Sequence, residues 1–186
     1  MSALPKHYRL LYASFIRLAC TMILFALFTG ILHRESTRHL SYANLAPGIH
    51  WEAIYHLALV HGHIFMIGVI LPIITLVMLH FGMILRAAPL SETTIAWGKR
   101  LYHTGAGLML GLFIYKAYHY VLSVRFGLLD FSKIETTYFA GNSLLKALLY
   151  GLSHTAMAVG LGIFAVGLLK TMPSVKQVKT ESPSTF

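Results

Sequence analysis

The chain has 186 residues, of which 56% are hydrophobic and only 11% are charged. Its mean hydropathy of +0.67 lies outside the range of ordinary soluble domains and predicts a membrane protein. Lys and Arg exceed Asp and Glu by 15 to 6, but no basic aromatic surface motif accompanies them, so nucleic-acid binding is not expected. The single cysteine, Cys20, excludes an intrachain disulfide framework and a thiolate metal cluster.

Four apolar segments are long enough to cross a bilayer, whose hydrocarbon core of about 30 Å needs roughly 20 helical residues. They cover residues 11–32, 54–78, 101–124 and 144–169. The sequence therefore predicts an all-α, polytopic membrane protein in which residues 1–170 form a single four-helix transmembrane domain. No small-residue cleavage pattern follows the first segment, so we expect it to be retained. The polar residues 171–186 are expected to form a disordered cytoplasmic tail.

The distribution of charge predicts the orientation of the spans. One side carries mainly basic residues: Lys6, Arg9, Arg86, Lys99, Arg100, Lys170, Lys176 and Lys179. The other side mixes basic with acidic residues: Arg34, Arg38, Arg125, Lys133 and Lys146 with Glu35, Glu52, Asp130 and Glu135. We therefore expect both termini on the cytoplasmic side (N-in/C-in). The short connection before the third span carries a turn and a helix-cap signal at residues 89–92.

Two histidines, His61 and His63, interrupt the apolar second span with only Gly62 between them. Imidazole is costly to bury in hydrocarbon unless its nitrogens find partners. Residues two apart on a helix differ by about 200° in direction, so the two rings should serve two sites, or one site and one structural hydrogen bond. His154 lies at similar depth in the fourth span. It could be a ligand, or it could simply bond a carbonyl one turn away.

The remaining features of the spans are compatible with a bound cofactor but do not point to one by themselves. The other histidines lie near span ends or in connections and are expected to be solvated, with His119 kept as a reserve ligand: His33, His39, His50, His56, His80 and His103. Glycines in the last three spans predict close helix packing. Gly62 and Gly151, each within a turn of a candidate ligand, could leave room for a flat macrocycle. Pro72 predicts a kink in the second span.

Several stretches of the chain resemble, in order, a bacterial four-helix membrane family known only as a domain of unknown function. The matching marks are Arg-Glu-x-Thr at residues 34–37, His-x-His at 61–63 and Gly-x-x-His at 151–154. The third span departs from the family pattern, because residues 115–119 replace an Arg-Gly pair. The resemblance implies a protein of the bacterial inner (cytoplasmic) membrane.

A more distant resemblance bears on chemistry. The stretch VHGHIFMIGVILP is similar to the second helix of haem-copper oxidase subunit I, where a histidine followed eleven residues later by proline carries the low-spin haem. His61 and Pro72 have the same spacing. That subunit has twelve helices in three pseudo-equivalent sets of four. The resemblance therefore implies a haem-copper-oxidase-like four-helix unit that assembles as a homo-oligomer, with a trimer as the first choice.

The resulting prediction is a membrane protein that binds b-type haem, with copper as a candidate second metal, for electron transfer or small-gas redox chemistry. Its electron donor is not identified, and catalysis as an oxidoreductase stays open. His61 is the leading axial ligand, opposite His154 or a symmetry-related histidine, and His63 faces a second site. Arg34, Arg38 and Arg125 are expected to pair with haem propionates. The alternatives are a metal-handling membrane transporter and a structural assembly factor without haem.

Overall fold

The computed structural model describes residues 4–38, 40, 47–85 and 87–173. All of its regular elements within these ranges are helices, and four of its helical segments are long and apolar enough to cross a membrane. The four-span, all-α prediction is confirmed. The helices are α1 (Lys6–Thr37), α2 (Pro47–Phe65), α3 (Leu71–Ile84), α4 (Glu92–Arg125), α5 (Phe131–Thr137) and α6 (Ser143–Thr171). Arg86 and residues 174–186 of the predicted tail lie outside the described residues.

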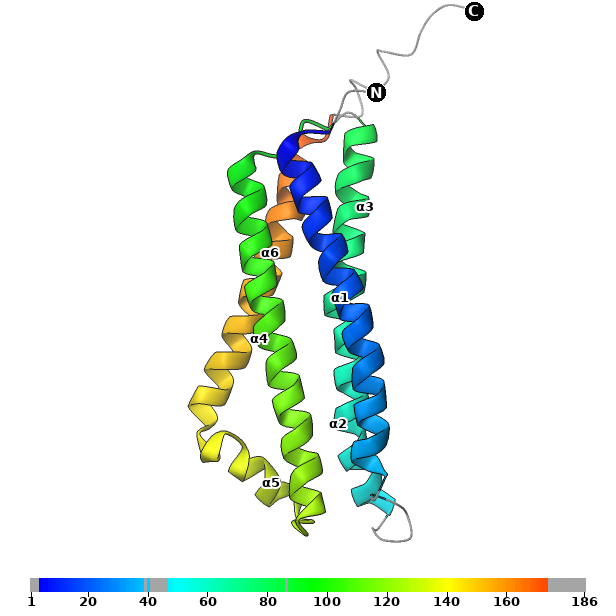
Figure 1. The fold of residues 1–186 in the computed structure, drawn as a ribbon. Coiled ribbons are helices and arrows are strands. Elements are labelled where there is room, and N and C mark those ends of the chain that lie inside the picture. Colours follow the sequence, from blue (N-terminus) through cyan, green and yellow to red (C-terminus); the bar gives the residue numbers. More distant parts are fainter. Residues whose placement is uncertain (1–3, 39, 41–46, 86, 174–186) are drawn as a thin grey trace, which may run out of the picture.

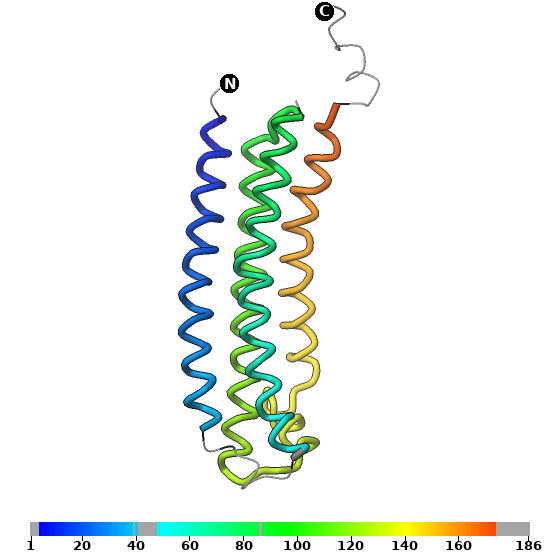
Figure 2. Tube along the Cα trace, turned by 90° about the vertical axis from the view of Figure 1, so that its right-hand side faces the viewer, coloured from blue at the N-terminus to red at the C-terminus, as the bar shows by residue number. Residues whose placement is uncertain are grey.

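The long helices form an elongated bundle (Figure 1). The second span is a continuous helical segment from Gly48 to Ile84 that includes α2 and α3. It packs against α4, and in Figure 2 α1 and α6 lie on opposite sides of this central pair. Lys6 and Thr171 lie at one end of the bundle, here called the terminal end. The opposite end, where α1 finishes and α2 begins, carries α5 and is called the α5 end.

Several helices extend past the predicted apolar spans. The helix α4 begins at Glu92 instead of residue 101, because the Ser91 side chain caps it and accepts a hydrogen bond from the Thr94 N–H at 3.2 Å. This confirms the cap signal read from residues 89–92. The helix α1 likewise starts at Lys6, five residues before the predicted span. Helical backbone needs no apolar side chains once it leaves the hydrocarbon, so hydropathy marks the core of each helix and not its ends.

Pro72 shapes the second span through a π-helical turn, η1 (Met66–Ile70). The Leu71 N–H donates to Met66 O, one residue farther back than in an α-helix. Pro72 has no N–H to give to the next carbonyl, Ile67 O. The hydroxyl of Tyr102, fully buried on α4, donates to that carbonyl instead. The sequence predicted a kink at Pro72, and the structure has a π-helical turn directly before it, whose free carbonyl accepts a hydrogen bond from a neighbouring helix.

The helices α4 and α6 pack most closely near the terminal end and at mid-span. A side-chain carbon placed at Gly160 would lie 2.6 Å from Tyr102 N, and one at Gly105 would meet the backbone of Met157. This confirms close packing through small residues for this helix pair. Gly62 and Gly151 meet nothing within 4 Å, so both positions border open space.

Toward the α5 end, α6 diverges from α4, and α5 lies across the space between them (Figure 1). The Asp130 side chain caps α5 and accepts from Ser132 N at 3.0 Å. The chain then turns into α6 through the short helix η2 (Tyr138–Gly141), where Phe139 and Ala140 have φ of 55° and 53°. The sequence predicted only a connection here. The helix α5 was missed because it is short and has no long apolar period.

Candidate functional site

His61 lies on α2 where that helix faces α1. Its Cε1 is 3.9 Å from the point where a side-chain carbon would stand at Gly30, and its ring packs edge-on against Phe65 at 5.1 Å. Its Nδ1 atom is buried and has no hydrogen-bond partner among the described residues. A buried ring nitrogen without a partner carries a desolvation cost that a ligand could relieve.

His63 faces a different helix. Its Nδ1–H donates to Leu59 O at 2.7 Å, and its ring lies 3.9 Å from the Phe113 ring of α4. The predicted opposite directions of His61 and His63 are therefore seen as contacts with α1 and α4, respectively. In a neutral ring, the donated Nδ1 proton leaves the lone pair on Nε2.

His154 lies on the exposed surface of α6, within the span. Its Nδ1–H donates to Tyr150 O at 2.9 Å. This is the carbonyl one turn away that a purely structural histidine would use. The same contact also fixes the ring and directs Nε2 outward, as second-shell contacts do for metal ligands. The open space at Gly151 lies one turn from the ring on the same helix.

The three histidines do not converge within the chain. The helix α4 packs against both α2 and α6, and it separates them in the half of the bundle near the α5 end (Figure 1). Over the described ranges, no three His, Cys, Asp or Glu side chains are grouped closely enough to hold a metal ion. A site that uses both His61 and His154 therefore needs residues from more than one copy of the chain.

His33 is closer to His61 than sequence reasoning anticipated. The sequence placed His33 among solvated loop residues, but α1 continues to Thr37 and includes it. It is half-buried, and its ring is near enough to His61 for the two to interact electrostatically. Its position three residues after Gly30, on the same helical face, is the signal that could have found it once the helix end was known.

The predicted propionate partners all lie at the α5 end. Arg34 and Arg38 belong to the last turn of α1 and its cap, and Arg125 is the last residue of α4. Arg38 is exposed and lies 3.7 Å from Glu35 in a surface ion pair. Arg34 and Arg125 are exposed, so both are accessible to an anionic group.

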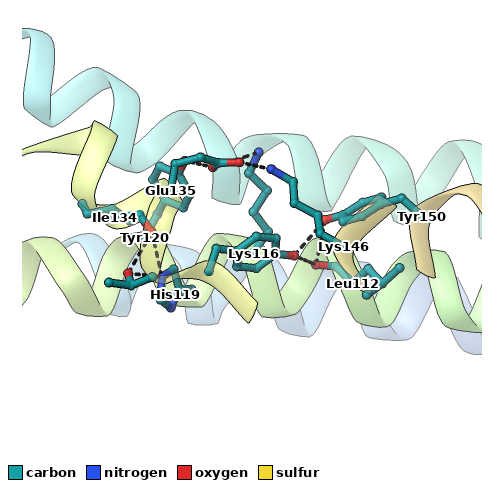
Figure 3. A network of polar contacts seen from close by, with 10 residues as sticks. Leu112, Lys116, His119, Tyr120, Ile134, Glu135, Lys146 and Tyr150 are labelled. Carbon is teal, nitrogen blue, oxygen red and sulfur yellow. Dashed lines mark hydrogen bonds and ion pairs between the residues drawn. The ribbon is translucent and has the colours of Figure 1, made fainter. Parts of the chain in front are cut away.

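A second cluster, which the sequence did not predict as a unit, joins α4, α5 and α6 (Figure 3). We call it the Glu135 network. The Glu135 carboxylate accepts a short hydrogen bond from the Tyr120 hydroxyl and pairs closely with Lys146, while Lys116 Nζ lies 3.9 Å away. Charge-assisted contacts of this kind are stronger than neutral ones. The network therefore fastens α5 to two long helices.

Electrostatics at Glu135 reflect these partners. Burial raises the pKa of the Glu135 carboxyl, but the contacts with Lys146, Tyr120 and Lys116 outweigh it and hold that pKa below its ordinary value. The carboxylate is therefore ionised at neutral pH and neutralises part of the charge of the two lysines. His56 of α2 joins the edge of the network, with its ring 4.1 Å from that of Tyr120.

Hydroxyl groups extend the network along α6. The hydroxyls of Tyr138 and Tyr150 lie 2.9 Å apart, and Leu112 O lies 3.3 and 3.4 Å from them, so one hydroxyl can donate to the other while the second donates to this carbonyl (Figure 3). His119, the reserve ligand of the sequence prediction, donates its Nε2–H to Ile134 O at 3.2 Å and lies 3.1 Å from the Thr137 hydroxyl. His119 thus has a structural role in holding α5.

Comparisons with known proteins found no family model, no curated protein and no solved structure that matches the chain. The four helical segments that are long and apolar enough to cross a membrane define the class of the chain only as a multi-pass membrane protein.

Proposed function

We propose that this chain is a b-type haem-binding protein of the bacterial inner membrane, in which His61 and His154 hold the iron and the cofactor serves electron transfer or small-gas redox chemistry. The environment of His154 supports the proposal most directly. His154 presents an imidazole on the exposed side of a membrane helix, where contact with lipid alone leaves its Nε2 without a hydrogen-bond partner. A metal ligand or a second protein surface would satisfy that nitrogen.

The residues present fit such a cofactor at four points. The Nδ1 contact with Tyr150 O holds the His154 ring with its other nitrogen outward, which suits ligation. His61 has a buried nitrogen without a partner. Gly62, next to His61 in the chain, and Gly151, one turn before His154, border open space. The exposed Arg34, Arg38 and Arg125 could bind the propionates, since guanidinium matches carboxylate geometry. Bound haem iron would supply one-electron or gas-binding chemistry, with copper at His63 as a candidate second metal.

We also infer that the protein assembles as a homo-oligomer, with a trimer as the first choice. Because α4 separates His61 from His154, a copy that supplies His154 must contact another copy that supplies His61. The exposed side of α6 suits this contact, since it carries a face of small and polar residues spaced by three or four positions: Ala147, Gly151, His154 and Ala158. Native mass spectrometry should then show a closed ring, whereas a monomer as the only species would overturn the shared site.

Haem content tests the proposal. Protein extracted in mild detergent from haem-replete cells should give a positive pyridine haemochromogen assay with non-covalent haem. His61→Ala and His154→Ala should each lower haem content to background, because loss of an axial ligand weakens iron binding. His63→Ala should keep most of the haem. His80→Ala is the matched control, because His80 is an exposed histidine nearer the terminal end.

Other outcomes separate the alternatives. Colourless wild-type protein that retains copper would favour the metal-handling transporter, and colourless protein without metal would favour the assembly factor. Loss of haem in His33→Ala but not in His154→Ala would replace His154 by His33 as the second ligand and place the whole site within one chain.

A further inference from the structure

A groove between α1 and α4 opens at the terminal end of the bundle. It encloses about 140 Å³, and its walls are lined by residues of both kinds, apolar and charged: His7, Leu10, Leu11, Glu92, Ile95, Ala96, Lys99 and Arg100. On this measure of volume a single water needs only about 10–15 Å³, so the groove has room for a small polar headgroup. His7 is fixed at one wall, because its Nε2–H donates to Leu90 O at 3.0 Å.

The cations of this groove have no ion-pair partner in the described part of the chain. Lys99 is half-buried and Arg100 is exposed, and neither forms one of the ion pairs seen among the described residues. Glu92 supplies one negative charge at the rim and is itself not paired with them. The groove therefore keeps a net positive charge.

A third cation, Arg17, lies deeper on the same side of α1. Arg17 follows Leu10 by seven residues and so shares its helical face, and the intervening Ser14 approaches His103 of α4 at 3.5 Å. Arg17 is exposed and makes no ion pair with any described residue. It lies six residues past the predicted start of the span at residue 11, so about 9 Å below it. Arg17 does not line the groove itself, but helical side chains lean toward the helix N-terminus, so its long, flexible side chain can extend toward the groove.

We propose that this groove binds the phosphate of an anionic phospholipid, held by Lys99, Arg100 and Arg17. Lys99 and Arg100 have no ion-pair partner among the described residues and lie just before the predicted start of the third span at residue 101, so the phosphate of a lipid at the membrane–water boundary can reach them. The groove walls also carry the apolar residues Leu10 and Ile95. A cation as deep as Arg17 is costly in hydrocarbon unless an anion accompanies it. An anion that belongs to the bilayer, with its own acyl chains, can reach that depth.

The test uses the full chain in detergent, titrated with phosphatidylglycerol or phosphatidylethanolamine and followed by native mass spectrometry. Phosphatidylglycerol should bind in preference to the zwitterionic lipid. Lys99→Gln, Arg100→Gln and Arg17→Gln should each weaken phosphatidylglycerol binding about fivefold, as expected for loss of one cation near a membrane surface. The control Lys170→Gln removes an exposed cation from α6 at the same end and should leave binding unchanged.

Two further measurements keep the proposal falsifiable. Lys99→Arg and Arg100→Lys keep the charge and should retain binding, which separates loss of charge from damage to the fold. Addition of inorganic phosphate should not displace the lipid. Wild-type binding in all three glutamine variants, equal binding of the two lipids, or displacement by inorganic phosphate would each overturn the proposal, the last by indicating a site for a free anion.

Discussion

The two halves of the α4–α6 pair are held together in different ways. Near the terminal end and at mid-span, the two backbones touch through Gly98, Gly105 and Gly160, and the contacts are neutral. Toward the α5 end the helices separate, and the Glu135 network bridges them through charged groups and tyrosine hydroxyls (Figures 1 and 3). Where the two helices approach closely, small residues are enough to form the contact. Where the helices are farther apart, α5 and its charged groups connect them instead.

The lysines of the two halves differ in whether they have an ion-pair partner. Lys116 and Lys146 share the Glu135 carboxylate, so their charges are partly neutralised within the protein. Lys99 at the terminal end has no such partner among the described residues. The paired lysines hold helices together, whereas the unpaired lysine beside the groove remains available to bind a ligand. The terminal half should accordingly depend little on pH, and the half near the α5 end should depend on it clearly.

The largest effect is expected at the close contact in the terminal half. Gly160→Val would place side-chain atoms against the backbone at Tyr102 N and Gly98 O, and neither can move without moving α4. Overpacking of this kind costs about 3 kcal/mol, and the thermal unfolding midpoint in detergent should fall steeply. The control Gly162→Val adds the same atoms where nothing lies within 4 Å. Equal midpoints for the two variants would mean that this contact does not hold the helices together.

A smaller effect is expected at the π-helical turn. Tyr102→Phe removes the hydroxyl that satisfies Ile67 O and leaves a buried carbonyl without a donor. We expect a loss of about 2 kcal/mol in the free energy of unfolding, unchanged between pH 4 and pH 7 because no charge is involved. Tyr115→Phe, at an exposed tyrosine, is the control and should have little effect. If the control lowers the midpoint as much as Tyr102→Phe, the hydrogen bond to Ile67 is not the cause.

The smallest effect, but the one that depends on pH, is expected in the Glu135 network. Glu135→Gln removes the charge that faces Lys116 and Lys146 and should cost about 1 kcal/mol at pH 7, because the Glu135 side chain is 36% exposed and its contacts are partly screened. Since the native pKa of Glu135 is lowered, its contribution is present above the ordinary value of 4.5 and is lost as pH falls through the native pKa.

The difference between wild type and Glu135→Gln should therefore shrink on acidification, which unfolding midpoints at pH 7 and pH 4 would measure. Glu35→Gln is the comparison, because Glu35 forms an exposed ion pair with Arg38 and should change stability by no more than about 0.5 kcal/mol. A constant difference across this range would show that the Glu135 charge does not stabilise the half near the α5 end.

Much of the architecture follows from local patterns in the sequence. Four apolar runs and the Ser91 cap each depend on neighbouring residues, and both are seen in the structure. Before Pro72, where the sequence predicted a kink, the structure has a π-helical turn. The opposite directions of His61 and His63 follow from helical geometry alone. The haem, copper and trimer predictions stay predictions, because they concern groups that lie outside a single chain.

The sequence by itself determined that this is a membrane protein of four helical spans, with His61, His63 and His154 well inside the second and fourth, because hydropathy and helical period are properties of adjacent residues. Only the tertiary structure decided which residues from distant segments meet. It placed His33 on α1, the helix that His61 faces, separated His154 from His61, and gathered Glu135, Lys116 and Lys146 into one network. Such pairings depend on where each helix ends and how the helices pack against one another. The short-range pattern of the sequence does not specify either.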